Sequence, residues 1–170
     1  MDLQEALSGA IEYEHEIRDY YAGCAKQIAD AKGQRVFAIL AREEQSHVEY
    51  LETRLVEWQA DGSVNAAELP TLLPPLAWVL EEAKKLANRV NGAQGVAQAE
   101  IDFLKEALEL ERKTSAFYAE LVAKLESKHR GLFERFLEIE NGHLAIVQAE
   151  IDALAGHGHW FDFMEFSLEK

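Results

Sequence analysis

The sequence predicts an all-α fold, in which a long crossover joins two helical hairpins into a four-helix bundle. Prolines occur only at Pro70, Pro74 and Pro75, so the long stretches before and after this cluster are free to be helical. Both stretches carry apolar residues at helical spacing, and the second stretch repeats a pattern of the first. Because a chain of 170 residues is most simply one domain, the two stretches are expected to share a core.

The first hairpin is predicted from two long helices. The first helix spans about 3–30 and is expected to stop near Lys32, with Gly33 as its terminator. The second helix follows to about residue 60 and ends at Asp61-Gly62-Ser63, a typical stop sequence. Because the turn between the two helices is short, they are expected to be antiparallel.

A connector and a second hairpin follow. The connector, at about 61–92, holds the prolines and then an amphipathic stretch at 76–90 that predicts a shorter helix. The second hairpin is predicted from helices at about 93–126 and 131–154, the latter ending at Gly156. The connector is long enough to travel the length of a bundle, so it can act as a crossover between the two hairpins.

The two halves share a pattern of chemically active residues. A glutamate precedes a tyrosine by seven positions, and a Glu-x-x-His motif follows about 30 residues after the glutamate. The first copy is Glu14, Tyr21, Glu44 and His47, and the second copy is Glu111, Tyr118, Glu140 and His143. The offset between copies is 97 residues for the first part and 96 for the second, as one residue less in the turn would produce. An internal duplication of a hairpin explains this and predicts an approximate two-fold axis.

Helical phase decides which glutamates point into the bundle. Residues three, four and seven apart share a helix face, whereas residues two apart differ by about 200°. Glu14 therefore shares a face with apolar residues such as Ile17, and Glu12 lies among polar residues. The same comparison selects Glu111 over Glu109 in the second half. The two Glu-x-x-His motifs also lie on apolar faces.

Six inward-facing residues predict a site for two metal ions. A buried carboxylate without a partner is costly, and four of them together would repel and could not all stay ionised. Two divalent ions would balance the four charges, and two neutral imidazoles would complete the coordination. A site of several carboxylates with imidazole nitrogen favours iron or manganese over zinc or copper. The predicted ligands are Glu14, Glu44, His47, Glu111, Glu140 and His143.

Two tyrosines and the C-terminal segment have more than one interpretation. Tyr21 and Tyr118 lie two turns beyond Glu14 and Glu111 on the same faces, either as core aromatics or as hydroxyl donors that steady a ligand carboxylate. We expect residues 1–155 to form the bundle. The tail at 156–170 contains two histidines and several aromatic residues, and it is expected to pack on the bundle or on a partner subunit rather than to bind a further metal.

Composition excludes several classes of partner and cofactor. The formal net charge of −14 argues against nucleic acid and anionic membranes and is compatible with binding cations. The first residues lack the basic start and apolar run of a signal peptide, and no stretch approaches the roughly 18 apolar residues that span a bilayer, so a cytoplasmic location is expected. Cys24, expected to be a small buried hydrophobe, is the only cysteine. Disulfides, iron–sulfur clusters and four-cysteine iron sites within this chain are therefore excluded.

With these motifs, the sequence resembles the rubrerythrin-like branch of the ferritin-like superfamily, over about 150 residues. The resemblance implies a ferritin-like four-helix bundle and a non-haem di-iron carboxylate centre, with manganese or mixed metals as variants. Two features depart from rubrerythrin itself. The chain has no four-cysteine rubredoxin domain, and Thr114 stands where rubrerythrins carry an additional glutamate, three residues after Glu111. The remaining set of four glutamates and two histidines is closer to that of bacterioferritin.

Four functions are compatible with this centre. The first is a redox enzyme that reduces hydrogen peroxide or dioxygen with electrons from an external rubredoxin-like or flavoprotein donor, expected as a homodimer. The second is a ferroxidase and iron-storage protein, which needs a shell of many subunits. The third is a di-iron oxygenase acting on an organic substrate, which needs an apolar channel beside the site. The fourth is a purely structural metal site, which an open coordination position would exclude.

Overall fold

The computed structural model describes residues 2–65, 69–87, 98–161 and 163. These residues contain five α-helices and no strand. The all-α prediction is therefore confirmed for the described part of the chain. None of these helices is both long and apolar enough to cross a lipid bilayer. The helices are α1 (Leu3–Gln27), α2 (Ala31–Asp61), α3 (Leu76–Ala87), α4 (Gln98–Lys124) and α5 (Ser127–His157).

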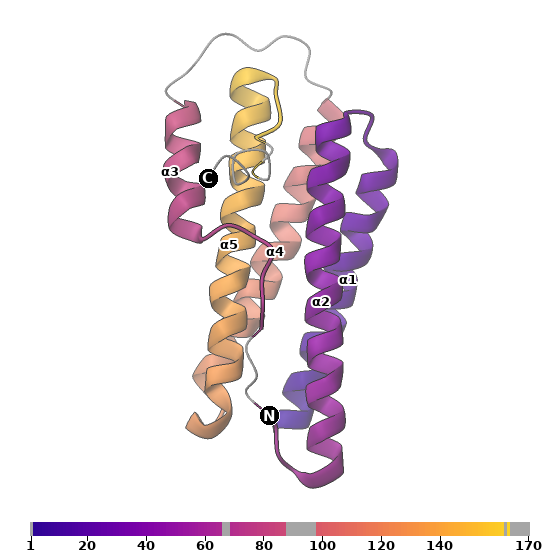
Figure 1. The fold of residues 1–170 in the computed structure, drawn as a ribbon, viewed down its shortest axis with the longest axis vertical. Helices are drawn as coiled ribbons and strands as arrows, with labels where there is room; N and C mark the ends of the chain where they lie inside the picture. The colour runs from indigo at the N-terminus through magenta and orange to yellow at the C-terminus, as the bar shows by residue number, and fades with distance from the viewer. Residues whose placement is uncertain (1, 66–68, 88–97, 162, 164–170) are drawn as a thin grey trace.

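The helices form two antiparallel pairs, α1 with α2 and α4 with α5 (Figure 1). The pairs also contact each other through α1 and α4, and α3 packs along α5. In Figure 1, α2 ends at the lower end of the molecule, and the segment from residue 69 to residue 75 rises to the start of α3. The shorter helix that the sequence predicted at 76–90 is present as α3 over Leu76–Ala87. Residues 88–90 of that prediction lie outside the described part of the chain. The predicted start of the next helix, at about 93, lies outside it as well.

The turn between α1 and α2 differs from the prediction. Helix α1 ends at Gln27, and Asp30 caps the start of α2, its carboxylate accepting hydrogen bonds from the backbone N–H groups of Lys32 and Gly33. Gly33 lies in the first turn of α2, so the prediction that it terminates the preceding helix was wrong. Aspartate is a preferred N-cap because its side chain satisfies backbone N–H groups that have no partner within the helix.

Gly33 instead permits a close contact with the C-terminal segment. A Cβ atom placed on Gly33 would lie 2.5 Å from two ring atoms of Trp160 and 2.8 Å from Ile28. The Trp160 ring packs edge-on against Phe37 in α2, with ring centroids 6.0 Å apart. Trp160, Phe161 and Phe163 are buried, so this part of the tail belongs to the core.

The substitution Gly33→Ala is expected to destabilise the protein by about 1–3 kcal/mol, because the added methyl group overpacks the contact with Trp160. Alanine favours a helix over glycine by about 1 kcal/mol. A net loss of stability in Gly33→Ala would therefore be due to the steric contact and not to helix propensity. Gly23→Ala in α1 is the matched control, since a Cβ there meets no atom within 4 Å. Chemical denaturation of the two variants gives the comparison, and equal or greater stability of Gly33→Ala than of Gly23→Ala would contradict the expectation.

Helix ends elsewhere show which glycine stops a helix. Gly62 follows α2 with a φ of 72°, as the predicted stop requires, and its N–H donates to the carbonyl of Trp58. The predicted limits of the last helix, Gly131 and Gly156, were wrong. Helix α5 begins one turn earlier, at Ser127, and extends to His157, where it is capped by Gly158 in the left-handed conformation with a φ of 72°. Gly131 and Gly156 lie within the helix, where a glycine costs some stability but does not break the backbone hydrogen bonds.

In each helical pair, one buried charged residue of the second helix makes a hydrogen bond to the segment that follows the pair. Arg54 in α2 donates to the carbonyl oxygen of Asn65, in the connector. Glu150 in α5 accepts a hydrogen bond of 2.7 Å from the backbone N–H of Phe161. Both residues stand seven positions after the histidine of their Glu-x-x-His motif, so the two halves use the same helix position with opposite charges.

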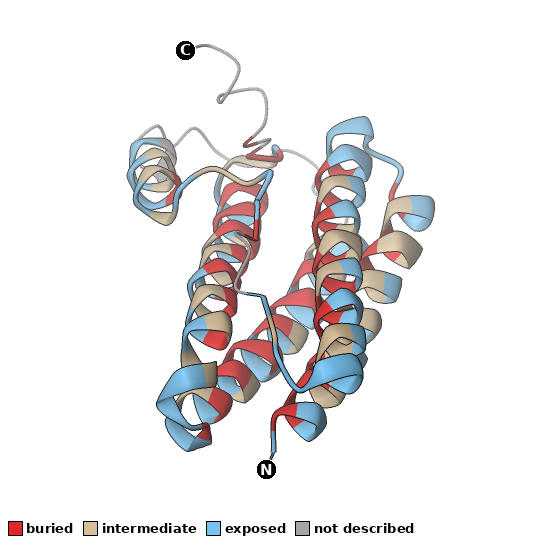
Figure 2. Ribbon diagram, turned by 60° about the horizontal axis from the view of Figure 1, so that its bottom comes forward, coloured by how far each residue is buried: buried red, intermediate tan, exposed pale blue. Residues whose placement is uncertain are grey.

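The core consists of two apolar clusters separated by a polar layer. One cluster gathers around Tyr21, Phe37 and Val147, and the other around Leu51, Tyr118 and Phe136. Along α1, α2, α4 and α5, the buried residues of one cluster give way to buried carboxylates or imidazoles and then to the other cluster. Figure 2 shows the buried faces of the helices turned towards one another. The fold therefore surrounds a polar layer with apolar side chains on both sides.

Candidate metal centre

The polar layer is formed by the six side chains that the sequence predicted as ligands. Helices α1 and α4 contribute one glutamate each, and α2 and α5 contribute one Glu-x-x-His motif each. All six are fully buried, each with 0% exposure: Glu14, Glu44, His47, Glu111, Glu140 and His143. Glu12 and Glu109 are exposed, in agreement with the helical phase. The glutamate and the histidine of each motif are three positions apart, so both side chains leave the same side of a helix.

The two histidines present the same ring nitrogen to the carboxylates. The Nδ1 atom of His47 lies 2.9 Å from Glu44 Oε2 and 3.6 Å from Glu140 Oε1. The Nδ1 atom of His143 lies 2.8 Å from Glu44 Oε1 and 3.7 Å from Glu140 Oε2. Glu44 and Glu140 thus each turn one oxygen towards each histidine. The imidazole rings are parallel to within 2°, with centroids 5.4 Å apart.

Each histidine also has one carboxylate from the neighbouring helices. His47 Nδ1 is 3.1 Å from Glu14 Oε2, and His143 Nδ1 is 3.6 Å from Glu111 Oε1. Ligand atoms of Glu14, Glu44, His47 and Glu140 lie within 4.8 Å of one another, and so do those of Glu44, Glu111 and His143. The layer therefore offers two adjacent positions that could hold a metal ion, with Glu44 common to both.

Many polar atoms of this layer make no well-directed hydrogen bond with the described residues, although some lie within ion-pair distance of one another. They include both oxygens of Glu44 and of Glu140, one oxygen of Glu111 and both ring nitrogens of His143. Buried polar atoms are nearly always paired, so such a concentration points to a ligand that accepts their lone pairs. Carboxylate and imidazole atoms that face one another suit cations of intermediate hardness, and the donor set therefore fits two divalent metal ions.

Electrostatics show how strongly the layer attracts positive charge. Burial favours a neutral imidazole, but the carboxylates of Glu44 and Glu14 outweigh it and raise the pKa of His47 to about 10. Burial raises the pKa of Glu14 to about 7 despite the attraction of His47. Burial also raises the pKa of Glu140 well above its usual range, with Glu14 and Glu44 adding to the shift. Metal-free protein thus holds protons that a metal ion would displace.

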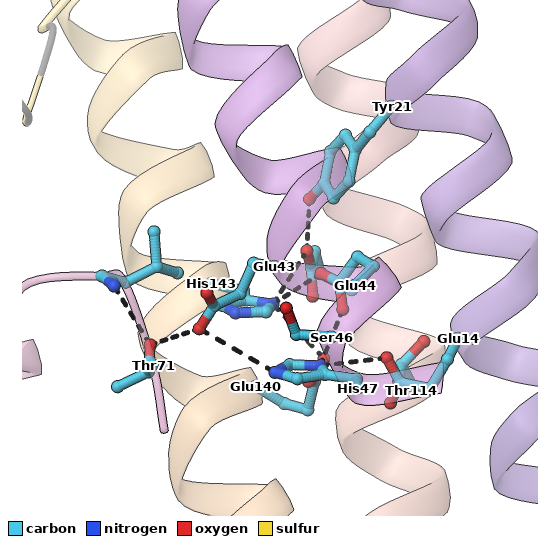
Figure 3. Close-up of polar contacts among 12 residues, drawn as sticks. Glu14, Tyr21, Glu43, Glu44, Ser46, His47, Thr71, Thr114, Glu140 and His143 are labelled. Atoms are coloured by element: carbon cyan, nitrogen blue, oxygen red, sulfur yellow. Dashed lines mark hydrogen bonds and ion pairs between the residues drawn. The ribbon is translucent and has the colours of Figure 1, made fainter. Parts of the chain in front are cut away.

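Both tyrosines donate to ligand carboxylates, and each reaches across to the other hairpin. The hydroxyl of Tyr21 in α1 donates to Glu111 Oε1 in α4, and that of Tyr118 in α4 donates to Glu14 Oε1 in α1. Figure 3 shows the Tyr21 hydroxyl directed at the layer of carboxylates. Burial, followed by these carboxylates, raises the pKa of both hydroxyls well above the usual range, so they remain donors. The tyrosines are therefore both core aromatics and hydrogen-bond donors.

Sequence reasoning missed Glu43. This residue precedes the first Glu-x-x-His motif and is buried, with 1% exposure. It accepts hydrogen bonds from the hydroxyl of Thr71 and, at 3.0 Å, from the backbone N–H of Leu72. Its Oε1 atom lies 3.9 Å from Nε2 of His47. A signal was present, since Glu43 stands four positions before His47 and so shares its helix face.

Other candidates lie away from the layer or are occupied. His15 is partly exposed, 3.8 Å from Glu52, and His129 packs edge-on against Trp58. Cys24 is buried, as expected. The hydroxyl of Thr114 donates to the carbonyl of Leu110 within α4. Thr114 thus adds no carboxylate to the polar layer.

Comparison with protein-family models, with curated proteins and with solved structures gave no match.

Proposed function

We propose that this protein is a non-haem di-iron redox protein with a ferritin-like bundle, which reduces hydrogen peroxide or dioxygen with electrons from an external donor. One observation carries the proposal: four carboxylates and two imidazoles, all at 0% exposure, form a single layer in the core. Several of these buried atoms make no well-directed hydrogen bond with the described residues, and metal ions bound between them would account for this. The helix order, two hairpins with a connector and a short helix between them, is compatible with ferritin-like connectivity.

The residues divide naturally between two ions. His47 and Glu14 would hold one ion, and His143 and Glu111 would hold the other. Glu44 and Glu140 would lie between the ions, since each offers one oxygen to each side. Two iron ions there would supply the two electrons that, with two protons, convert hydrogen peroxide into two water molecules. Manganese fits the same donor set.

The surrounding side chains would control the reaction. Tyr21 and Tyr118 hold the carboxylates of Glu111 and Glu14, which keeps the two terminal carboxylates in fixed orientations. The apolar clusters on both sides keep bulk water from the layer, which strengthens its electrostatic interactions.

Electrons would have to come from another molecule. The chain has one cysteine, which cannot hold an iron–sulfur cluster or a rubredoxin iron. A rubredoxin-like protein or a flavoprotein is a suitable donor class. The net charge of −14 favours a donor with a local basic patch. We expect the protein to work as a homodimer.

Reduced, iron-loaded protein is expected to be oxidised rapidly by one stoichiometric addition of oxidant, and turnover is then expected to stall until a reductant is supplied. The measurement is anaerobic reconstitution with Fe²⁺, followed by stopped-flow absorption in the near-ultraviolet with hydrogen peroxide and dioxygen compared. Addition of a rubredoxin-like or flavin-based donor should restore turnover. Oxidation by either oxidant no faster than that of free Fe²⁺ would remove the redox proposal. A solution mass of many subunits with iron accumulation would favour iron storage instead.

A second candidate, oxidation of a small organic substrate, is favoured by one cavity. A cavity of about 220 Å³ lies between the connector and α5. Its lining includes Leu73, Pro74 and Ile139, and also Gly142. Thr71 also lines the cavity, and its hydroxyl donates to Glu43 beside His47, so the cavity reaches the edge of the polar layer. Oxygen consumption that depends on an added apolar compound, with an oxygenated product, would support this candidate over peroxide reduction.

A further inference from the structure

The outer nitrogens of the two histidines face away from the carboxylate layer. Nδ1 of each ring is directed at the carboxylates, and Nε2 of each ring has no hydrogen-bond partner among the described residues. Glu43 lies beside both rings. One ligand atom from each of Glu43, His47 and His143 lies within 4.8 Å of the others. Figure 3 shows the Glu43 carboxylate between Thr71 and the imidazole rings.

Glu43 is held in this place by the connector rather than by its own helix. The Thr71 hydroxyl donates to Oε1, and the backbone N–H of Leu72 donates to Oε2 over 3.0 Å. An ionised carboxylate offers about four acceptor positions, so two remain for the two outer nitrogens. At 3.9 Å from His47 Nε2 the attraction is electrostatic, and it favours the proton on Nε2. Nδ1 is then left free as a ligand atom.

This arrangement breaks the symmetry of the duplication. The position that corresponds to Glu43 in the second half is 96 residues later, and it is Ile139. Ile139 is buried and lines the cavity against the connector, so it offers no acceptor to either histidine. Among the described residues, Glu43 is therefore the carboxylate placed beside both rings on this side, and it comes from the first half.

We propose that Glu43 is a positioning residue shared by His47 and His143, and that Thr71 and Leu72 hold it so that the connector sets the orientation and affinity of both metal positions. The inference rests on the proposed metal centre. Outer partners of metal-bound histidines fix the ring orientation and raise the basicity of the ligand, and their loss typically costs about 10–100-fold in affinity. Thr71 would then influence metal ions that it does not touch.

The test uses Co²⁺ as a probe, because its visible absorption reports the ligand field while competition with a chelator gives the affinity. Thr71→Val and Glu43→Gln are each expected to weaken Co²⁺ binding about tenfold or more and to change the spectrum. Thr71→Ser keeps the hydroxyl and should retain both properties of the unmodified protein. Thr71 is exposed, so its variants should fold. Thr53→Val is the matched control, since Thr53 is exposed on α2 and donates only to the backbone carbonyl of Glu49.

The outcomes separate this inference from the metal centre itself. Two Co²⁺ ions bound with unchanged affinity and spectrum in Thr71→Val and Glu43→Gln would overturn the role of Glu43 and leave the metal centre standing. Equal losses in Thr71→Val and Thr53→Val would also overturn it, because the effect would then be a general one. Absence of Co²⁺ binding by the unmodified protein would overturn the metal centre and this inference with it.

Discussion

Replacing Glu14 or Glu111 with alanine is expected to abolish binding of at least one metal ion, whereas Glu12→Ala and Glu109→Ala are expected to leave both ions bound. The members of each pair are two positions apart on the same helix, and their burial differs completely. Glu14 and Glu111 have 0% exposure and face the histidines, while Glu12 and Glu109 are exposed. Each inner glutamate supplies a ligand that no neighbouring side chain can replace, because the other carboxylates of the layer are already shared between the two positions.

Metal analysis after anaerobic reconstitution with Fe²⁺ and gel filtration gives the number of ions per chain. Glu14→Ala also removes the acceptor of the Tyr118 hydroxyl, and a buried donor left without a partner costs about 1–3 kcal/mol. Glu14→Gln avoids this loss, since its amide oxygen can still accept from Tyr118 while the charge is removed. If Glu14→Gln loses as much bound metal as Glu14→Ala, the loss is therefore due to the missing carboxylate ligand. Equal metal loss in the inner and outer variants would refute the role assigned to helical phase.

The polar layer was predictable because helical periodicity turns a one-dimensional pattern into a face. A glutamate that shares a face with leucine and isoleucine has no route to solvent, so the phase of Glu14 and Glu111 alone implied burial. The duplication supplied a second, independent copy of the same pattern. Helix ends were less predictable. Gly62 and Gly33 are both plausible stops in the sequence, and only the cap formed by Asp30 and the contact with Trp160 distinguish them.

Contacts between distant segments were beyond the reach of the sequence. Tyr21 donates to Glu111 and not to Glu14 because of how α1 and α4 lie against each other. The periodicity of a single helix carries no information about this packing. Glu43 was missed for a related reason. Its importance comes from Thr71 and Leu72, 28 and 29 residues away in an irregular segment whose register against α2 has no sequence pattern.

Metal binding is expected to raise the stability of the protein, and to raise it more at higher pH. In metal-free protein the pKa of Glu14 is about 7, above its ordinary 4.5, because burial disfavours the charge. The stabilising effect of its protonation is complete below pH 4.5 and is lost as the pH rises to about 7. The pKa of His47 is about 10, above its ordinary 6.5, because neighbouring carboxylates outweigh burial. Its contribution is likewise lost between about pH 6.5 and 10.

The pKa of Glu44 is shifted in the opposite direction, so its contribution to stability depends on pH with the opposite sign. Burial works against its charge, but the two histidines lower its pKa below the ordinary 4.5, so its contribution is lost only as the pH falls into the acid range. From about pH 5 to 9, the metal-free protein should therefore become steadily less stable, as Glu14 and then His47 release protons. A divalent ion replaces those protons as the source of positive charge, and it binds more tightly once they have left.

Thermal melts between pH 5 and 9, with and without saturating Mn²⁺, measure this difference. At a free metal concentration a thousandfold above Kd, linkage predicts about 4 kcal/mol of added stability, which is about 10 °C for a domain of this size. The melting temperature of the metal-free protein should fall with pH, and that of the loaded protein should change less. Glu14→Gln should flatten the metal-free curve between about pH 4.5 and 7, where Glu14 contributes, and should also reduce the part due to His47, because the Glu14 carboxylate helps to raise the pKa of His47. Melting temperatures that coincide with and without Mn²⁺ across this range would show that the buried carboxylates are neutralised by protons alone, and that the layer does not bind metal.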